Sequence, residues 1–385
     1  MVVHVDVAPA LLRWAVERAG WDETTAARRA PQLGSWLTGE KRPTLKQLEK
    51  FATATHAPFG SLFLSEPPDE PVPIPDMRTI GNAGVSRPSV DLLDTIYICQ
   101  RRQDWYRDHA IDNGAERLGF VGSVTLDMPS ESVADVISEM LGFGVEERQV
   151  FPSWARAFRG LIDGTENVGV LVMVNGVVGA DTHRRLDPAE FRGFALSDPL
   201  APLIFVNGAD TKAAQLFTLV HELAHIWLGH SALSEAAMDS REGKTEEQWC
   251  NSVAAQVLLP LDDLRSDYGG RPTSEELDRL AKRYRTSTLV VLKRIADAGL
   301  LPWDEYVERY RVEYERVMEL VRDRGGDGGG GSYYNTQPLR LSRRFARAVV
   351  SSALEGSTTY REAYQLLGTR KHATFEGLAE TLKVA

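Results

Sequence analysis

One five-residue stretch limits what this chain can fold into: His221, Glu222 and His225 spell H-E-x-x-H inside an apolar segment. Residues four apart lie one turn above each other on an α-helix, so both imidazoles can face one cation. Glu222 then points towards the remaining coordination space. The stretch therefore predicts a buried helix that carries a metal site with a base beside it.

The residues around the motif favour a helix over a chance match. Asp210 or Thr211 can cap its start, Gly229 can end it, and the residues between are mostly apolar. The alternative is a core helix with two hydrogen-bonded histidines. Because the chain has only eight histidines, a chance H-E-x-x-H has a probability on the order of 1%. We therefore interpret the motif as a metal site.

A third ligand must lie elsewhere, since a catalytic zinc generally takes three protein ligands and leaves a fourth position for water. His230 follows His225 by five residues and would face away unless the helix ended abruptly. A second helix is predicted over residues 245–259. In its first turn Glu247 shares a face with small and apolar residues, and Glu246 points roughly 100° away. We favour Glu247 over Glu246; the alternative is that both only stabilise the positive end of the helix dipole.

These motifs and the strands before them resemble a known family. The segments that carry the resemblance are 191–198, 202–207, 217–225 and 247–255. They look like the ImmA/IrrE family of zinc metallopeptidases, over roughly residues 150–265. The resemblance implies a zincin-like fold with zinc ligands and a catalytic base, namely His221, His225 and Glu247 for zinc and Glu222 as the base. It also implies that the chain cleaves, or otherwise controls, a transcriptional repressor or a partner protein.

Composition and periodicity divide the whole chain into seven parts. Proline-rich and glycine-rich stretches mark two linkers, and helical patterns fill most of the rest. The predicted parts are an XRE-like helix-turn-helix module at 1–64, a proline-rich linker at 65–90, a helical scaffold at 91–149, the zinc-peptidase core at 150–265, a helical module at 266–324, a glycine-rich linker at 325–336 and a C-terminal helical module at 337–385. The predicted fold class is α+β and mostly helical, with a small β-sheet in the peptidase core.

Strands are predicted only in the core. Residues 168–174 and 177–179 flank Asn175-Gly176, which predicts a β-hairpin with a type I′ turn. Two further strands are predicted at 193–196 and 203–206. An exposed strand beside the metal helix could bind an extended peptide by adding it to the sheet. A peptide is therefore the expected class of substrate.

The N-terminal module resembles XRE-type repressor domains, which bind DNA. The stretch that should hold the recognition helix, residues 30–37, is short, and only Gln32 and Ser35 in it are polar enough to read bases. Lys41 and Arg42 follow as basic candidates for DNA contact. DNA binding through residues 1–64 and a role in protein docking both remain open.

Overall composition limits the remaining functions. The chain is 43% hydrophobic and 25% charged, which is ordinary for a globular protein, and its net charge of -10 argues against wholesale nucleic-acid coating. Cys99 and Cys250 lie far apart in apolar segments, so we expect no disulfide and a cytoplasmic location. We find no signal peptide and no apolar run of about 18 residues, so we expect no membrane span.

An arginine stripe is predicted after the glycine-rich linker. One helical face there carries Arg340, Arg343, Arg344 and Arg347. The stripe could meet nucleic acid or an acidic partner, although a solvated face is the commoner meaning of such a pattern.

Two classes of function follow. The first is a zinc endopeptidase that cleaves a regulatory protein such as a repressor, with Glu222 activating a zinc-bound water; Mn²⁺ or Fe²⁺ could replace Zn²⁺. The second is a DNA-binding regulator, or the antitoxin of a toxin-antitoxin pair, in which the zinc domain docks a protein such as the toxin. The residue that stabilises the oxyanion cannot be chosen from spacing, since His183, Tyr333 and Tyr334 are all conceivable.

Overall fold

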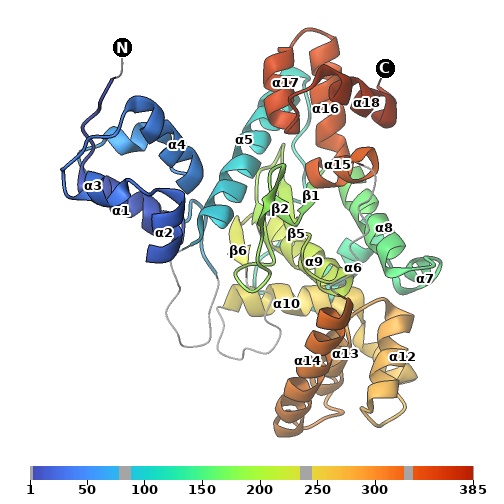
Figure 1. Cartoon of the computed structure of the whole chain (residues 1–385). Coiled ribbons are helices and arrows are strands. Elements are labelled where there is room, and N and C mark those ends of the chain that lie inside the picture. Colours follow the sequence, from blue (N-terminus) through green and yellow to red (C-terminus); the bar gives the residue numbers. More distant parts are fainter. Residues whose placement is uncertain (1–2, 78–87, 235–244, 325–332, 385) are drawn as a thin grey trace. The chain divides into compact units, whose positions relative to one another are not determined.

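A computed structural model gives the fold (Figure 1). It describes residues 3–77, 88–234, 245–324 and 333–384. These residues form two compact units. The first unit contains the residues up to Pro73 and those from Pro88 to Ile96, and the second contains Ile74–Met77 and everything described from Tyr97 onward. The predicted fold class, α+β and mostly helical, is confirmed.

The first unit is a cluster of short helices. They are α1 (Pro9–Arg18), α2 (Glu23–Arg29), α3 (Leu33–Leu37), α4 (Leu45–Thr55) and the 3₁₀ helix η1 (Phe59–Phe63). The side chain of Asp22 caps α2 by accepting from the Thr25 amide, and Thr44 and Gln47 form a capping box at α4. Helix α3 has only five residues, because Pro31 precedes it and Gly39 adopts a positive φ just after it.

The second unit surrounds a small sheet with helices. The helices on the amino-terminal side of the metal motif are α5 (Val90–Asp112, which begins in the first unit), α6 (Ser130–Leu141), α7 (Val145–Gln149) and α8 (Trp154–Asn167). The two helices that carry the candidate ligands are α9 (Lys212–Leu228) and α10 (Thr245–Leu258). The later helices are α11 (Leu261–Asp267), α12 (Ser274–Tyr284), α13 (Thr288–Asp297), α14 (Trp303–Arg324), α15 (Tyr333–Leu341), α16 (Arg343–Leu354), α17 (Tyr360–Leu367) and α18 (His372–Leu382). Within the described residues, no helix is long and apolar enough to cross a membrane.

The main sheet has four strands in the order β1-β5-β4-β6. These strands are β1 (Leu171–Asn175), β4 (Gly193–Leu196), β5 (Leu203–Asn207) and β6 (Ala232–Ser234). Strands β1 and β5 run parallel, and β4 is antiparallel to both β5 and β6. The strands predicted at 193–196 and 203–206 are therefore confirmed. This order makes the short strand β6 an edge of the main sheet, and β6 also contacts α9.

The predicted β-hairpin is wrong. Strand β1 pairs with β5, while β2 (Val177–Val178) pairs with β3 (Asp181–Arg185) in a separate two-stranded sheet. Every residue of β1 is buried, as is typical of a strand in a parallel pair that is covered on both faces. The Asn175 side chain donates to the Gly179 carbonyl and accepts from the Val177 amide, so the turn leads the chain out of the main sheet.

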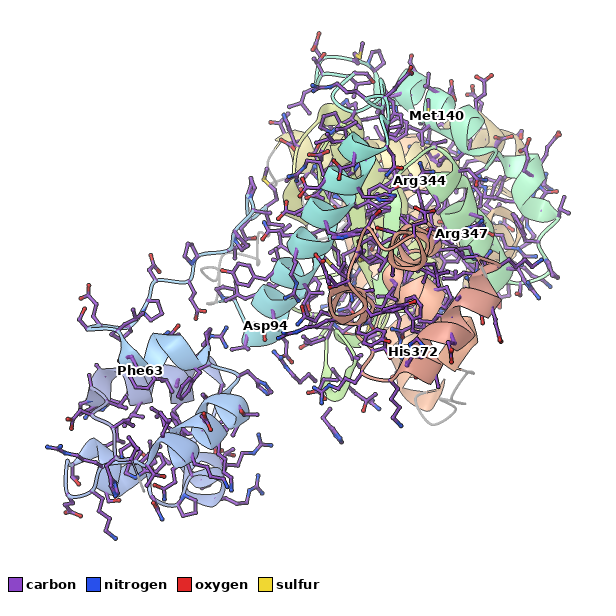
Figure 2. All side chains as sticks on the ribbon, turned by 90° about the horizontal axis from the view of Figure 1, so that it is seen from above. Phe63, Asp94, Met140, Arg344, Arg347 and His372 are labelled. Carbon is purple, nitrogen blue, oxygen red and sulfur yellow. The ribbon has the colours of Figure 1, made fainter. Side chains whose placement is uncertain are left out.

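The arginine stripe is also not one continuous surface. Ser342 has a φ of 65° and separates α15, which carries Arg340, from α16, which carries the other three arginines. Arg344, labelled in Figure 2, donates to the Tyr106 hydroxyl at 2.8 Å and to the Glu166 carbonyl at 3.3 Å. Arg344 is exposed but held by groups of its own unit, and Arg340 lies on a different helix from the other three arginines.

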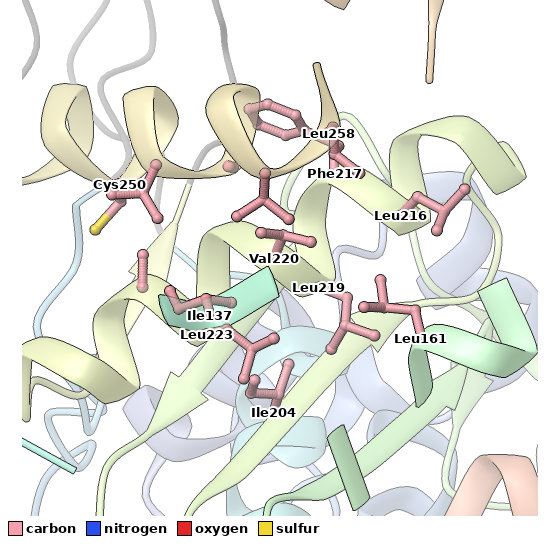
Figure 3. Packing of buried hydrophobic residues seen from close by; sticks show 14 of the residues in the cluster. Ile137, Leu161, Ile204, Leu216, Phe217, Leu219, Val220, Leu223, Cys250 and Leu258 are labelled. Carbon is pink, nitrogen blue, oxygen red and sulfur yellow. The ribbon is translucent and has the colours of Figure 1, made fainter. Parts of the chain in front are cut away.

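A hydrophobic core holds α9 between the sheet and α10. Figure 3 shows Leu219 and Leu223 on the side of α9 that faces Ile204 of β5, with Cys250 and Leu258 on α10 across from α9. These side chains are fully buried. Burying each leucine contributes about 1.5–3 kcal/mol. The core therefore fixes the face of α9 that is turned towards α10.

Candidate metal centre

Helix α9 is capped as its sequence predicts. Thr211 accepts a hydrogen bond from the Ala214 amide at 3.2 Å, and Gly229 ends the helix in the left-handed conformation with a φ of 79°. His221, Glu222 and His225 lie in its interior, and each is 0% exposed. The helix thus carries two imidazoles and a carboxylate completely out of water.

The structure brings Glu247 of α10 to the two histidines of α9. The Nε2 atoms of His221 and His225 are 3.2 Å apart. The Glu247 oxygens lie 3.3 Å from Nε2 of His221 and 3.1 Å from Nε2 of His225. Among the described residues, these three form the group of side chains whose geometry could hold a metal ion.

The three side chains fit a zinc ion. Two ligands bound at about 2.0 Å in tetrahedral geometry stand about 3.3 Å apart, which is close to the three separations between these ligand atoms. Within the described part of the chain, Nδ1 of His221 and both oxygens of Glu247 have no hydrogen-bond partner of good geometry. Buried polar atoms without partners are costly, and a cation among them would remove that cost for the carboxylate.

The electrostatics of the cluster also favour a cation. Burial raises the pKa of Glu247, but the adjacent His221 and His225 rings outweigh it and bring that pKa down to about 2. Burial lowers the pKa of His225, but Cys250, Glu246 and Glu247 raise it well above its usual value. Both shifts show that the acidic groups stabilise positive charge between them.

Glu222 lies beside this cluster without belonging to it. Its Oε2 accepts from the Ser234 hydroxyl at 3.4 Å, and its Oε1 has no hydrogen-bond partner among the described residues. Burial raises the pKa of Glu222 to about 8, to which Glu247 adds, while His225 and Ser234 oppose the rise. Such a carboxyl group can take up and release a proton near neutral pH.

Glu246 and His230 take different places from Glu247. One oxygen of Glu246 lies 3.0 Å from Nδ1 of His225 and 3.0 Å from Nδ1 of His230. The two glutamates therefore reach opposite nitrogens of the His225 ring, which agrees with their separation of roughly 100° on the helix. His230 is half-exposed and pairs with Glu246 rather than joining the ligand group.

Sequence reasoning missed one residue of the site, Ser234. Its hydroxyl lies 3.2 Å from Nε2 of His225 and also bonds Glu222. It reaches the site because β6 pairs with β4, and this pairing is not local in sequence. No spacing signal in the chain could have placed it there.

Gly193 is required where β4 passes under α9. A Cβ atom on Gly193 would lie 2.5 Å from the Thr218 methyl, 2.8 Å from the Phe205 carbonyl oxygen and 3.2 Å from Oε1 of Glu222. We expect Gly193→Ala to lower the free energy of unfolding by about 1–3 kcal/mol and to displace Glu222. Thermal unfolding and the rate of peptide cleavage measure the two effects.

A matched variant tests this packing argument. Gly60 lies in η1, and a Cβ atom there would come within 4 Å of no other described residue beyond its own chain neighbours, so Gly60→Ala should leave both quantities unchanged. If Gly193→Ala were as stable and active as the parent protein, β4 could not be packed this closely against α9.

None of the other candidate residues belongs to the ligand group found among the described residues. The amide oxygen of Gln32 accepts from Gln47, and the Ser35 hydroxyl donates to the Gln32 carbonyl. The Lys41 side chain is exposed, and Arg42 pairs with Asp6 at 3.0 Å. Of the oxyanion candidates, His183 lies on β3 of the separate small sheet, whereas the side chains of Tyr333 and Tyr334 lie outside the described residues.

Comparison with known proteins identifies the domain that contains this site. Residues 165–296 match the family described as the IrrE N-terminal-like domain. Through this domain, the chain belongs to the ImmA/IrrE family. The family of metallopeptidases predicted from the motifs is therefore confirmed. Residues 341–381, in the C-terminal helices, match a domain family of unknown function.

Two relatives carry the same description, "Radiation response metalloprotease IrrE". The one from Deinococcus deserti is 32% identical over 202 residues, which are 48% of this chain and 66% of that protein. The one from Deinococcus radiodurans is 33% identical over 138 residues, which are 34% of this chain and 40% of that protein. The chain thus spans about two thirds of the first relative's length and two fifths of the second's.

Proposed function

We propose that this chain is a zinc-dependent endopeptidase that hydrolyses a peptide bond in another protein. The observation that carries the proposal is the position of Glu222 beside the cluster of His221, His225 and Glu247: it is a buried carboxylate, and one of its oxygens has no hydrogen bond to any residue that the structure describes. The chain's membership of the ImmA/IrrE family and the names of its two relatives support the same activity.

The residues of the site divide the work of hydrolysis between them. His221, His225 and Glu247 would hold the zinc ion, which when bound supplies a Lewis acid and lowers the pKa of a water. Glu222 takes the proton from the attacking water at Oε1 and passes it to the leaving amine. The Ser234 hydroxyl donates to Oε2 and so helps to fix the orientation of the Glu222 carboxylate beside the ligand atoms.

We further propose that the substrate is a regulatory protein, such as a transcriptional repressor, and that the reaction takes place in the cytoplasm. The support for a regulatory substrate is the description of both relatives as radiation response proteins. The support for the location is that Cys99 and Cys250 are both free thiols in the protein interior.

The second candidate, a DNA-binding regulator or antitoxin, has less structural support. Helix α3 has only five residues, and Gln32 and Ser35 are engaged with neighbouring groups. Few side chains there can reach base edges in a major groove. We therefore propose that residues 1–64 dock a protein, and we rank DNA binding second.

Metal analysis and a peptide library test the peptidase proposal directly. We expect the purified chain to contain about one zinc ion, rather than manganese or iron, and to generate new amino termini in a proteome-derived peptide library read by mass spectrometry. Phenanthroline should abolish the cleavage, and added zinc should restore it. A zinc-loaded chain that cleaves nothing in the library or in its native lysate would contradict the proposal.

The outer edge of β6 is the proposed docking place for the substrate peptide, because Ser234 of β6 contacts both Glu222 and His225. Residues 75–77 already occupy this edge. Leu233 donates to the Pro75 carbonyl at 2.9 Å, the Met77 amide donates to the Leu233 carbonyl at 2.9 Å, and the two segments run parallel. A peptide that adds to β6 must therefore displace Pro75–Met77.

We expect Met77→Pro to increase peptide cleavage about two- to tenfold, because proline removes the N–H that donates to Leu233, a bond worth about 0.5–1.5 kcal/mol. Asp76 is already in an extended bridge, so it can precede a proline without strain. Initial rates on the peptide library measure the effect. Val72→Pro adds a proline to the same linker five residues earlier and should leave the rate unchanged. An unchanged or reduced rate in a Met77→Pro protein with full zinc content would place the peptide elsewhere.

A further inference from the structure

Glu246 makes a pair of contacts that the proposed ligand set does not use. Its Oε1 is 3.0 Å from Nδ1 of His225 and 3.0 Å from Nδ1 of His230. The side chain of Glu246 is mostly buried, that of His225 is completely buried, and that of His230 is half-exposed. A carboxylate thus lies between one imidazole of the metal cluster and one at the protein surface.

The contact determines which nitrogen of His225 carries the proton. A carboxylate oxygen can only accept, so the hydrogen bond requires a proton on Nδ1 of His225. In the neutral ring, which is the form that binds a metal ion, the lone pair then lies on Nε2, the atom 3.1 Å from Glu247 and 3.2 Å from His221. Glu246 and Glu247 are consecutive residues of α10, and they hold the same ring from its two nitrogens.

The two histidines of the cluster differ in this respect. Nδ1 of His221 has no hydrogen-bond partner among the described residues, whereas Nδ1 of His225 has Glu246. Histidines that bind metals usually donate their other ring N–H to a carboxylate, a carbonyl or a water, which fixes the orientation of the ring. In this chain, the Glu246 side chain accepts this second hydrogen bond from His225.

We propose that Glu246 is a positioning residue, which orients His225 towards the metal ion and is itself held in place by His230. This inference rests on the proposed metal centre, but it is separate from the activity. It also assigns a role to His230 that is not that of a ligand. A first-turn glutamate that only stabilised the helix dipole would need neither histidine.

Zinc affinity of the full chain, measured by competition with a fluorescent chelator, is the main test. We expect Glu246→Ala to weaken zinc binding about 10- to 100-fold. Glu246→Gln keeps an oxygen acceptor at the same place and should stay within about tenfold of the parent protein. His230→Ala should cause a smaller loss than Glu246→Ala, because His230 acts only through Glu246.

A spectroscopic measurement separates positioning from general damage to the fold. In the zinc-loaded protein, the Nδ1 proton of His225 should give a slowly exchanging imidazole resonance by ¹⁵N-edited NMR. Glu246→Ala should remove it and Glu246→Gln should retain it. Glu275→Ala is the matched control, since Glu275 is a first-turn glutamate of α12 far from the ligands in sequence, and it should change neither affinity nor resonance.

The outcomes distinguish this inference from the proposed function. If the parent protein binds no zinc, the proposed metal centre fails. If the parent binds zinc tightly and Glu246→Ala binds it equally well with the imidazole resonance intact, the metal centre stands and the role of Glu246 is overturned. Equal losses in Glu246→Ala and Glu275→Ala would likewise overturn it, because they would show that the loss of a first-turn glutamate weakens binding without any contact to His225.

Discussion

Replacing Glu222 with glutamine is expected to slow peptide cleavage by about 10²- to 10⁴-fold while the chain keeps its zinc. The amide has nearly the same size as the carboxylate but cannot take a proton from water at the position of Oε1. Because Glu222 is not among the three clustered ligand side chains, His221, His225 and Glu247 remain free to bind the ion. Cleavage of the peptide library and zinc content, measured on the same preparation, test both halves of this expectation.

A second buried glutamate provides the control. Glu166 is 7% exposed, its carboxylate accepts from the Ser342 hydroxyl, and it is not a member of the ligand group. Burial raises the pKa of Glu166 to about 7, so a neutral amide suits this environment. Glu166→Gln should therefore retain cleavage. If the Glu222→Gln protein retained full cleavage, Glu222 would have no part in the mechanism. If it lost cleavage but still acted normally in the cell, the result would favour the regulator or antitoxin.

The second large effect is expected from Glu247→Ala. This substitution removes the carboxylate of the ligand group and leaves only His221 and His225, whose Nε2 atoms are 3.2 Å apart. We expect zinc affinity to fall by more than about 100-fold, since loss of a direct ligand should exceed the 10- to 100-fold loss seen for supporting residues. Cleavage should disappear at any zinc concentration that the parent protein needs for activity.

Thermal unfolding provides an independent measure of this variant. A ligand that binds only the folded state at 1,000 times its dissociation constant stabilises it by about 4.1 kcal/mol. We therefore expect added zinc to raise the melting temperature of the parent protein but not that of Glu247→Ala. Glu275→Ala should respond to zinc like the parent. A zinc-dependent shift of full size in Glu247→Ala would place the ion elsewhere in the chain.

Local sequence was enough to predict the two helices of the site. The cap residue and the terminal glycine of α9 act within a few residues of the helix ends, so the sequence predicted Asp210 or Thr211 as the cap and Gly229 as the end, and the structure selects Thr211. The four-residue spacing of His221 and His225 places both rings on one face of any α-helix. Helix geometry alone also turns the side chains of Glu246 and Glu247 in different directions. For this reason the sequence favours Glu247, which is the residue that reaches both Nε2 atoms.

Strand pairing could not be obtained in the same way. The Asn175-Gly176 pair is typical of a hairpin, yet β1 pairs with β5, whose first residue lies 32 positions after the first residue of β1. The pairing is decided by burial on both faces of β1, which depends on the helices packed around it. The Asn175 side chain makes its hydrogen bonds to Gly179 and Val177 in the turn although the predicted hairpin does not form.

The sequence by itself therefore determined the metal-binding helix, its two histidines and the adjacent glutamate, because residues on one helix have a fixed geometry. Only the tertiary structure decided that Ser234 contacts Glu222, that Glu246 supports His225, and that Pro75–Met77 lie on the edge of β6. Each of these contacts joins segments from different elements. They depend on how the sheet and α10 pack against α9, and no spacing within one segment encodes that packing.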